Sequence, residues 1–185
     1  MEHALLKDAR SHMEKTLEVL KSELAKVHTG RANPALLEDV VVDYYGTPTP
    51  LKHLANIVAP DPDMIVVRPF DKSQIQAIER AIMQADLGLN PQNDGQIVRV
   101  KVPRLTEERR NELVRLVKSR GEEAKVALRN IRRDARERLE AQKKEGGLSE
   151  DDFFHLREEL DKLTHEYVQQ VDKLVEEKSQ EMRTL

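Results

Sequence analysis

A run of basic side chains between residues 125 and 138 offers the clearest chemistry in this sequence. It reads KVALRNIRRDARER, with six basic and two acidic residues, so its local net charge is +4. At about 100° per residue, Lys125, Arg129, Arg132 and Arg136 fall on one arc of a helix, with Arg133 just beyond it. Arginine can fork onto phosphate oxygens with two hydrogen bonds, which lysine cannot do. The run therefore indicates a phosphate-binding edge, and an ordinary solvated face is the alternative.

The surroundings of this run indicate which nucleic acid it would bind. No aromatic residue occurs between residues 106 and 145, whereas single-strand binders interleave aromatic rings that stack on bases. The basic residues also lie in the middle of their helix rather than at an end that could enter a major groove. These features favour contact with the backbone of a folded RNA, recognised by its shape.

Other residue types do not form a catalytic or metal-binding pattern. The six histidines are scattered, there is no cysteine, and no glycine-rich loop precedes a Lys-Ser or Lys-Thr pair. Gly146-Gly147 is more typical of a turn, and Asp61 and Asp63 are flanked by prolines as in a surface loop. We expect no enzyme activity, no metal and no cofactor.

Three long helices must position the basic run. Apolar residues recur at steps of three and four over residues 2–28, 106–145 and 149 to about 174. Thr106 and Ser149 are suited to begin the second and third helices, and Gly30 to end the first with a left-handed cap. At 1.5 Å per residue the helices would be roughly 40–60 Å long, which is typical of a rod-like bundle.

Between the first two helices the pattern changes to short strands and turns. Residues 40–45, 51–59, 64–70 and 96–102 are predicted strands, and a short helix is expected to follow Asp71. Residues 46–50 and Asn90-Pro91 are predicted turns because of their glycine and prolines.

The predicted fold class is α+β. Residues 1–30 and 105–185 would form a discontinuous, elongated antiparallel three-helix bundle, and residues 31–104 an inserted β/α/β domain. The chain would cross between the two domains twice, which predicts a hinge.

Composition and charge favour a monomeric cytoplasmic protein without a membrane span. Charged residues make up 35% and aromatics 3% of the chain, and no apolar run reaches the length of a membrane helix. The N-terminal sequence has acids and no apolar signal segment. The net charge is −3, but residues 106–145 carry +4 and residues 146–185 carry −6, so only one edge of the bundle is expected to attract RNA.

Four motifs resemble bacterial ribosome recycling factors, in the same order and over essentially the whole chain. They are DYYGTPTPL at 43–51, DLGLNP at 86–91, LTEERR at 105–110 and VALRNIRRDA at 126–135. The resemblance implies a tRNA-like shape with a three-helix domain I and a β/α/β domain II. It further implies binding to the large subunit of a ribosome that has finished translation, through 23S rRNA. Elongation factor G, using GTP, would then split the subunits.

The resemblance also implies site residues. Arg129, Arg132 and Arg133 match arginines that contact ribosomal RNA, and the Thr-Gly-Arg of the domain junction matches residues 29–31. The full RNA-binding prediction is Lys125, Arg129, Arg132, Arg133, Arg136 and Arg110, and the predicted hinge is Thr29, Gly30, Arg31, Pro103, Arg104 and Leu105.

Four positions depart from the family pattern. His28 replaces an expected arginine, so a cationic contact near the hinge would be pH-dependent or missing. Arg104 replaces a proline, Arg136 an asparagine, and Gly121 interrupts the basic helix at a cost of about 1 kcal/mol relative to alanine.

Two other functions are compatible with parts of the pattern. A helical RNA-binding adaptor or chaperone would explain the three apolar stripes, but not the inserted domain or the arginine file. A tRNA-binding arm of a synthetase would need a catalytic domain that the sequence does not show.

Overall fold

The structure, a computed structural model, describes residues 1–183 and separates them into two units. Met1–Leu24 and Val114–Arg183 form one, called here the helical unit, and Ala25–Leu113 form the other, the sheet unit. Long helices in the first and a small antiparallel sheet in the second confirm the predicted α+β class. The predicted domain boundaries, 30/31 and 104/105, both fall within the sheet unit.

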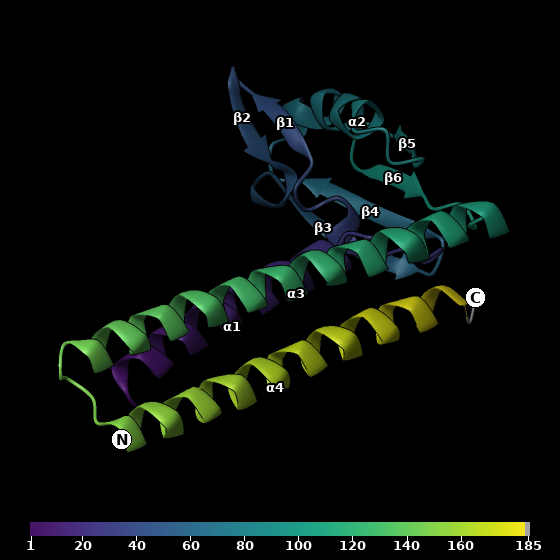
Figure 1. Cartoon of the computed structure of the whole chain (residues 1–185). Coiled ribbons are helices and arrows are strands. Elements are labelled where there is room, and N and C mark those ends of the chain that lie inside the picture. Colours follow the sequence, from purple (N-terminus) through teal and green to yellow (C-terminus); the bar gives the residue numbers. More distant parts are fainter. Residues whose placement is uncertain (184–185) are drawn as a thin grey trace. The chain divides into compact units, whose positions relative to one another are not determined.

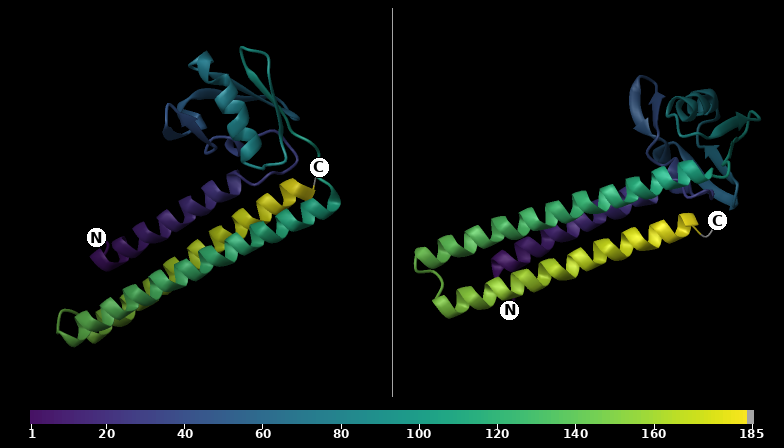
Figure 2. Two further views of the ribbon diagram at one scale, coloured as in Figure 1. Left: turned by 90° about the horizontal axis from the view of Figure 1, so that it is seen from above. Right: turned by 45° about the vertical axis from the view of Figure 1, so that its right-hand side comes forward.

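The helical unit consists of α1 (Ala4–Ala25), most of α3 (Glu107–Lys144) and α4 (Glu150–Arg183), which lie side by side in Figures 1 and 2. Arg138 of α3 is 2.8 Å from Asp8 and Arg120 is 4.0 Å from Glu23, so α3 runs antiparallel to α1. The predicted apolar stripes form the core, and its most completely buried side chains include Met13, Leu17, Leu20, Leu128, Leu139 and Leu160.

Side-chain oxygens begin the second and third helices as predicted. Thr106 Oγ1 accepts a hydrogen bond from the Arg109 N–H at 3.1 Å, and Ser149 Oγ accepts one from the Asp152 N–H at 3.1 Å. The prediction for the end of the first helix is wrong. The helix ends at Ala25, and Gly30 (φ 88°) lies in the following segment, where its N–H donates to His28 Nδ1 at 2.8 Å.

The sheet unit contains two sheets and one α-helix (Figure 1). Strands β1 (Val41–Tyr44) and β2 (Thr47–Pro50) form a hairpin. A four-stranded antiparallel sheet has the order β3-β4-β6-β5, in which β3 is Ala55–Asp61, β4 Met64–Pro69, β5 Asn90–Asn93 and β6 Val98–Lys101. Helix α2 (Ile75–Gln84) covers one face of this sheet, where Ile78 and Ile82 share a core with Ile65, Val67, Val98 and Val100.

Two segments predicted as turns are strands. Both β2 and β5 pair with a single neighbour, β1 and β6 respectively, so each has an edge that needs no hydrogen bond. Proline lacks an N–H and is tolerated at such edges, which explains Pro48, Pro50 and Pro91 within strands. The segment predicted as a strand from residue 51 instead begins with a short 3₁₀ helix, Leu51–His53, before β3.

Gly121 lies inside an unbroken α3, and its missing side chain has a packing role. A Cβ built there would lie 2.5 Å from Val175 Cγ2 of α4. Glycine therefore permits a close approach of α3 and α4. From the sequence alone, Gly121 could be read only as an unfavourable residue within the helix.

Candidate nucleic-acid interface

The predicted arginine file lies beside the buried stripe of α3. Leu128 and Ala135 face the core, Arg129 is exposed, and Arg132 is half-buried. Neither guanidinium group forms an ion pair or a hydrogen bond with any of residues 1–183. Two guanidinium groups are thus held on a rigid, packed helix with their hydrogen-bonding capacity unused by the rest of the described chain.

Arg133 and Arg136 are also exposed and are only loosely paired. Arg133 Nε is 3.8 Å from Asp134 and Arg136 Nε is 3.9 Å from Glu140, both beyond hydrogen-bonding distance. Exposed ion pairs of this kind contribute roughly 0–1 kcal/mol. These contacts would not prevent either arginine from binding phosphate.

Lys125 lies on the same arc but is engaged within the protein. Its ammonium group is ion-paired with Asp172 of α4 and lies 3.4 Å from Glu122, and its side chain is only 16% exposed. The hydrogen bond to Asp172 is the main cause that raises the pKa of Lys125. The structure therefore gives Lys125 a role in joining α3 to α4, which the RNA-binding prediction did not include.

Arg110 does not extend the file on α3. It belongs to the sheet unit, where it lines a hollow of about 870 Å³ beside the predicted hinge. Of the predicted set, the exposed Arg129, Arg133 and Arg136 and the half-buried Arg132 remain as the basic face of the helical unit, called here the arginine face.

Residues of the two predicted crossings come together in the sheet unit. The hollow beside Arg110 is lined by Thr29, Gly30, Arg31, Arg104 and Leu105, together with Pro62, Asp63 and Val102. The Ala32 N–H donates to Pro62 O at 2.6 Å, and the Val102 N–H donates to Asp63 O at 2.8 Å. Both crossings are thus tied to the same turn, between β3 and β4.

His28 is held as a neutral side chain in this region. Its Nδ1 accepts the Gly30 hydrogen bond, which requires that nitrogen to be unprotonated. Burial lowers the pKa of His28, the charge of Arg109 lowers it further, and the Pro103 carbonyl partly opposes them. Of the two outcomes expected at this position, the geometry therefore favours a missing cationic contact at neutral pH.

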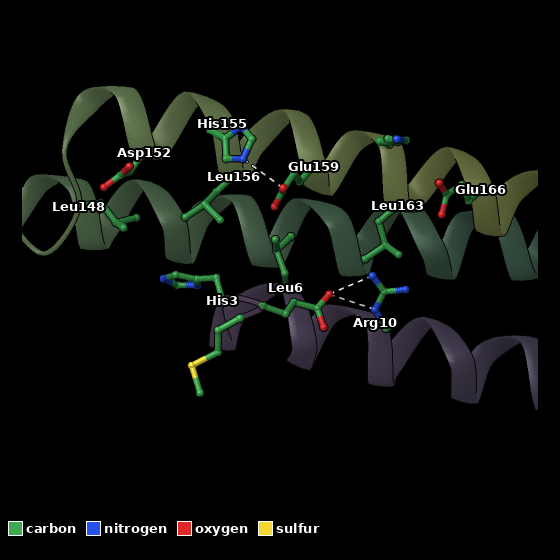
Figure 3. A pocket seen from close by; sticks show the side chains of 13 residues that line it. His3, Leu6, Arg10, Leu148, Asp152, His155, Leu156, Glu159, Leu163 and Glu166 are labelled. Atoms are coloured by element: carbon green, nitrogen blue, oxygen red, sulfur yellow. Dashed lines mark hydrogen bonds and ion pairs between the residues drawn. The ribbon is translucent and has the colours of Figure 1, made fainter.

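A second hollow lies in the helical unit but has no excess of positive charge. It measures about 780 Å³ and lies between α1 and α4 near their N-termini (Figure 3). Arg10 Nε and Nη2 both donate to Glu2 Oε1, at 3.0 and 2.9 Å. His155 Nε2 is 3.1 Å from Glu159 Oε1. Glu166 and Asp152 add further carboxylates. This hollow does not suit an anion.

Residues 1–183 contain no group of three or more histidine or acidic side chains placed to hold a metal ion. No helix within those residues combines the length and the apolar character needed to cross a membrane.

Comparison with known proteins identifies the family. The family model for ribosome recycling factor matches residues 20–182. The ribosome-recycling factor of Natranaerobius thermophilus is 50% identical over 97% of both chains, and that of Mycobacteroides abscessus is 50% identical over 96% of both.

Solved structures agree with the sequence matches. A solution structure of a ribosome recycling factor covers 100% of both chains at 41% identity, with a TM-score of 0.77. A second match, with 48% identity, 96% coverage of both chains and a TM-score of 0.68, is to models for the Thermus thermophilus ribosome recycling factor and the E. coli elongation factor G bound to the E. coli post-termination complex. The chain belongs to the ribosome recycling factor family.

Proposed function

We propose that this protein binds the large subunit of the post-termination ribosome through the arginine face and, with elongation factor G and GTP, splits the ribosome into subunits. It acts as a binding factor and performs no covalent chemistry of its own. The observation that carries the proposal is the position of Arg129 and Arg132, outside the core and without a partner among residues 1–183.

Physical chemistry supports RNA as the ligand of this face. Four arginines lie within eight residues of one helix, and no aromatic side chain accompanies them. Guanidinium groups bind phosphate oxygens with paired hydrogen bonds, and the rigid helix fixes their spacing before binding. A stiff row of cations without stacking rings fits the phosphate backbone of folded ribosomal RNA rather than a flexible single strand.

The proposed partner protein follows from a related protein. The T. thermophilus factor, 48% identical to this chain, is placed on the post-termination complex together with elongation factor G. We infer that this protein also acts together with elongation factor G, and that elongation factor G contacts the sheet unit and applies force to it. Residues 29–31 and 103–105 would bend during this step, because they lie next to Ala32 and Val102, where hydrogen bonds tie the chain to the turn between β3 and β4.

Substitution of the two unpartnered arginines tests the proposal. We expect Arg129→Ala with Arg132→Ala to weaken binding to isolated large subunits without changing the thermal midpoint of unfolding. Removing one arginine–phosphate interaction should flatten the slope of log affinity against log salt concentration by about 0.7–0.9. Binding is measured by co-sedimentation at several salt concentrations.

A matched control is available on the same helix. Arg120→Ala with Arg138→Ala removes the same charge, but those arginines pair with Glu23 and Asp8 of α1. This control should leave the salt slope unchanged. An unchanged slope for the Arg129/Arg132 variant, or an equal change for both variants, would refute the assignment of the arginine face.

A further inference from the structure

The four-stranded sheet has an uncovered face with its own chemistry. Side chains alternate along each strand, and Ile65, Val67, Val98 and Val100 point toward α2. Their neighbours therefore point to the opposite face, called here the outer face. Its polar residues are Asn56, Arg68, Asn90, Gln92, Arg99 and Lys101, and all six are exposed.

The cations of the outer face are close together. Arg99 and Lys101 are two residues apart on β6, about 7 Å along a strand. Because Val66 pairs with Arg99, Arg68 on β4 lies diagonally across from Arg99, at about 7–8 Å. Like charges at such distances repel, so this cluster does not stabilise the fold.

Among these three cations, only Arg99 has a carboxylate partner within residues 1–183. Arg99 Nη1 donates to Asp94 Oδ2 at 2.8 Å, while Asp94 Oδ1 accepts from the N–H groups of Gln96 and Ile97 at 2.9 Å each. Asp94 therefore fixes the position of the Arg99 side chain. The side chains of Arg68 and Lys101 have no ion-pair or hydrogen-bond partner among residues 1–183.

A hollow beside β5 and β6 is lined by four polar side chains, by the apolar residues Met64, Met83, Leu89 and Pro91, and by no carboxylate. It measures about 580 Å³, and Asn90, Gln92, Arg99 and Lys101 contribute its polar side chains. Asp61, a carboxylate that pairs in register with Met64 at the edge of the sheet, is not part of this lining.

We propose that the outer face is a second RNA-binding surface, which contacts the phosphate backbone of a folded RNA. This inference rests on the proposed function, because the ribosome supplies that RNA. Protein interfaces are usually centred on a protruding apolar or aromatic anchor, but Val66 at the centre of this face is only 8% exposed, and its partner Val58, on the edge strand β3, is 38% exposed. Within β3–β6 no residue of the outer face is aromatic, so there is no row of rings to stack with single-stranded bases, although the exposed Phe70 directly follows β4.

Site-specific crosslinking identifies the class of partner. A photoreactive amino acid is placed in the full chain at Gln92, which is exposed on the outer face, or at Gln76, which is exposed on α2 as a control. Each protein is irradiated with whole bacterial ribosomes. Crosslinks from position 92 to ribosomal RNA, exceeding those from position 76, are expected. Crosslinks from position 92 to protein alone, or none above the control, would overturn the proposal.

Charge substitution gives an independent measurement. Arg68→Gln with Lys101→Gln should flatten the salt slope of binding to whole ribosomes by roughly 1.4–1.8, because two cations no longer bind phosphate. Lys72→Gln with Arg80→Gln removes equal charge at the α2 side and should not flatten it. Equal slopes for the two variants would overturn the proposal.

The two proposals can fail separately. If Arg129→Ala with Arg132→Ala flattens the slope while the outer-face variant matches its control, the outer face is not a binding surface and the proposed function stands. If the Arg129/Arg132 variant has no effect on large-subunit binding, the proposed function itself fails.

Discussion

At the scale of single residues, the cations of α3 differ in what their neighbours offer them. Arg120 and Arg138 meet carboxylates of α1, and Lys125 meets Asp172 of α4. Arg129 and Arg132 meet none among residues 1–183. The elements packed beside each cation of this helix therefore decide whether its charge is paired within the protein.

His28 provides a prediction about pH. Its pKa is lowered in the folded protein, so the folded state binds fewer protons than the unfolded state, where the pKa is about 6.5. The stability of the folded state is then unaffected well above pH 6.5 and falls as the pH drops through and below that value. His28→Asn keeps an acceptor for the Gly30 N–H but does not titrate.

Thermal midpoints at pH 7.5 and 5.5 test this prediction. The natural chain should lose more stability between the two values than the His28→Asn variant. All other titrating groups are common to both proteins, so the difference isolates His28. Equal losses would show that His28 does not contribute to the acid sensitivity of the fold.

At the scale of elements, the contact of α3 with α4 depends on Gly121. Gly121→Ala gains about 1 kcal/mol of helix propensity, but its new methyl group would overlap Val175 Cγ2. Overpacking typically costs about 1–3 kcal/mol. We expect a net loss of stability on the order of 1 kcal/mol, measured by urea unfolding.

The Val175→Ala background supplies the control for this prediction. Removal of the Val175 methyl groups creates space for the alanine at position 121. Gly121→Ala should then be neutral or stabilising, with a coupling of about 0.5–3 kcal/mol between the two positions. The same stability change in both backgrounds would mean that the close approach of the helices does not require glycine.

At the scale of the whole molecule, the division into two units predicts that binding and splitting can be separated. The side chains of Glu23 and Arg120 are 4.0 Å apart, so α1 and α3 lie side by side here, and we expect a short flexible linker to join Leu24 to Val114 within the helical unit. The resulting protein retains the arginine face. We expect it to be helical by circular dichroism and to bind large subunits, because both properties belong to the helical unit.

The same protein should not split ribosomes with elongation factor G and GTP, because the unit proposed to receive the push is missing. Subunit splitting is followed by light scattering, with the full chain as reference. Splitting at the rate of the full chain would show that the sheet unit is dispensable and that the proposed mechanism is wrong.

Local features of the sequence were enough to predict the long helices, their starting residues and most of the core. Apolar periodicity and a capping oxygen act within a few residues of the chain, so Thr106, Ser149 and the stripe through Leu128 and Leu139 could be found without a structure. The family motifs are equally local, and the comparisons confirm the family they indicated.

Features that depend on distant neighbours were decided only by the tertiary structure. Edge strands containing proline resemble turns until their pairing partners are known, as β2 and β5 show. The packing role of Gly121 depends on Val175, and the engagement of Lys125 depends on Asp172. The spacing of residues along one helix predicts the direction of a cationic side chain. Whether that cation is paired depends on carboxylates from other parts of the chain, which the spacing does not show.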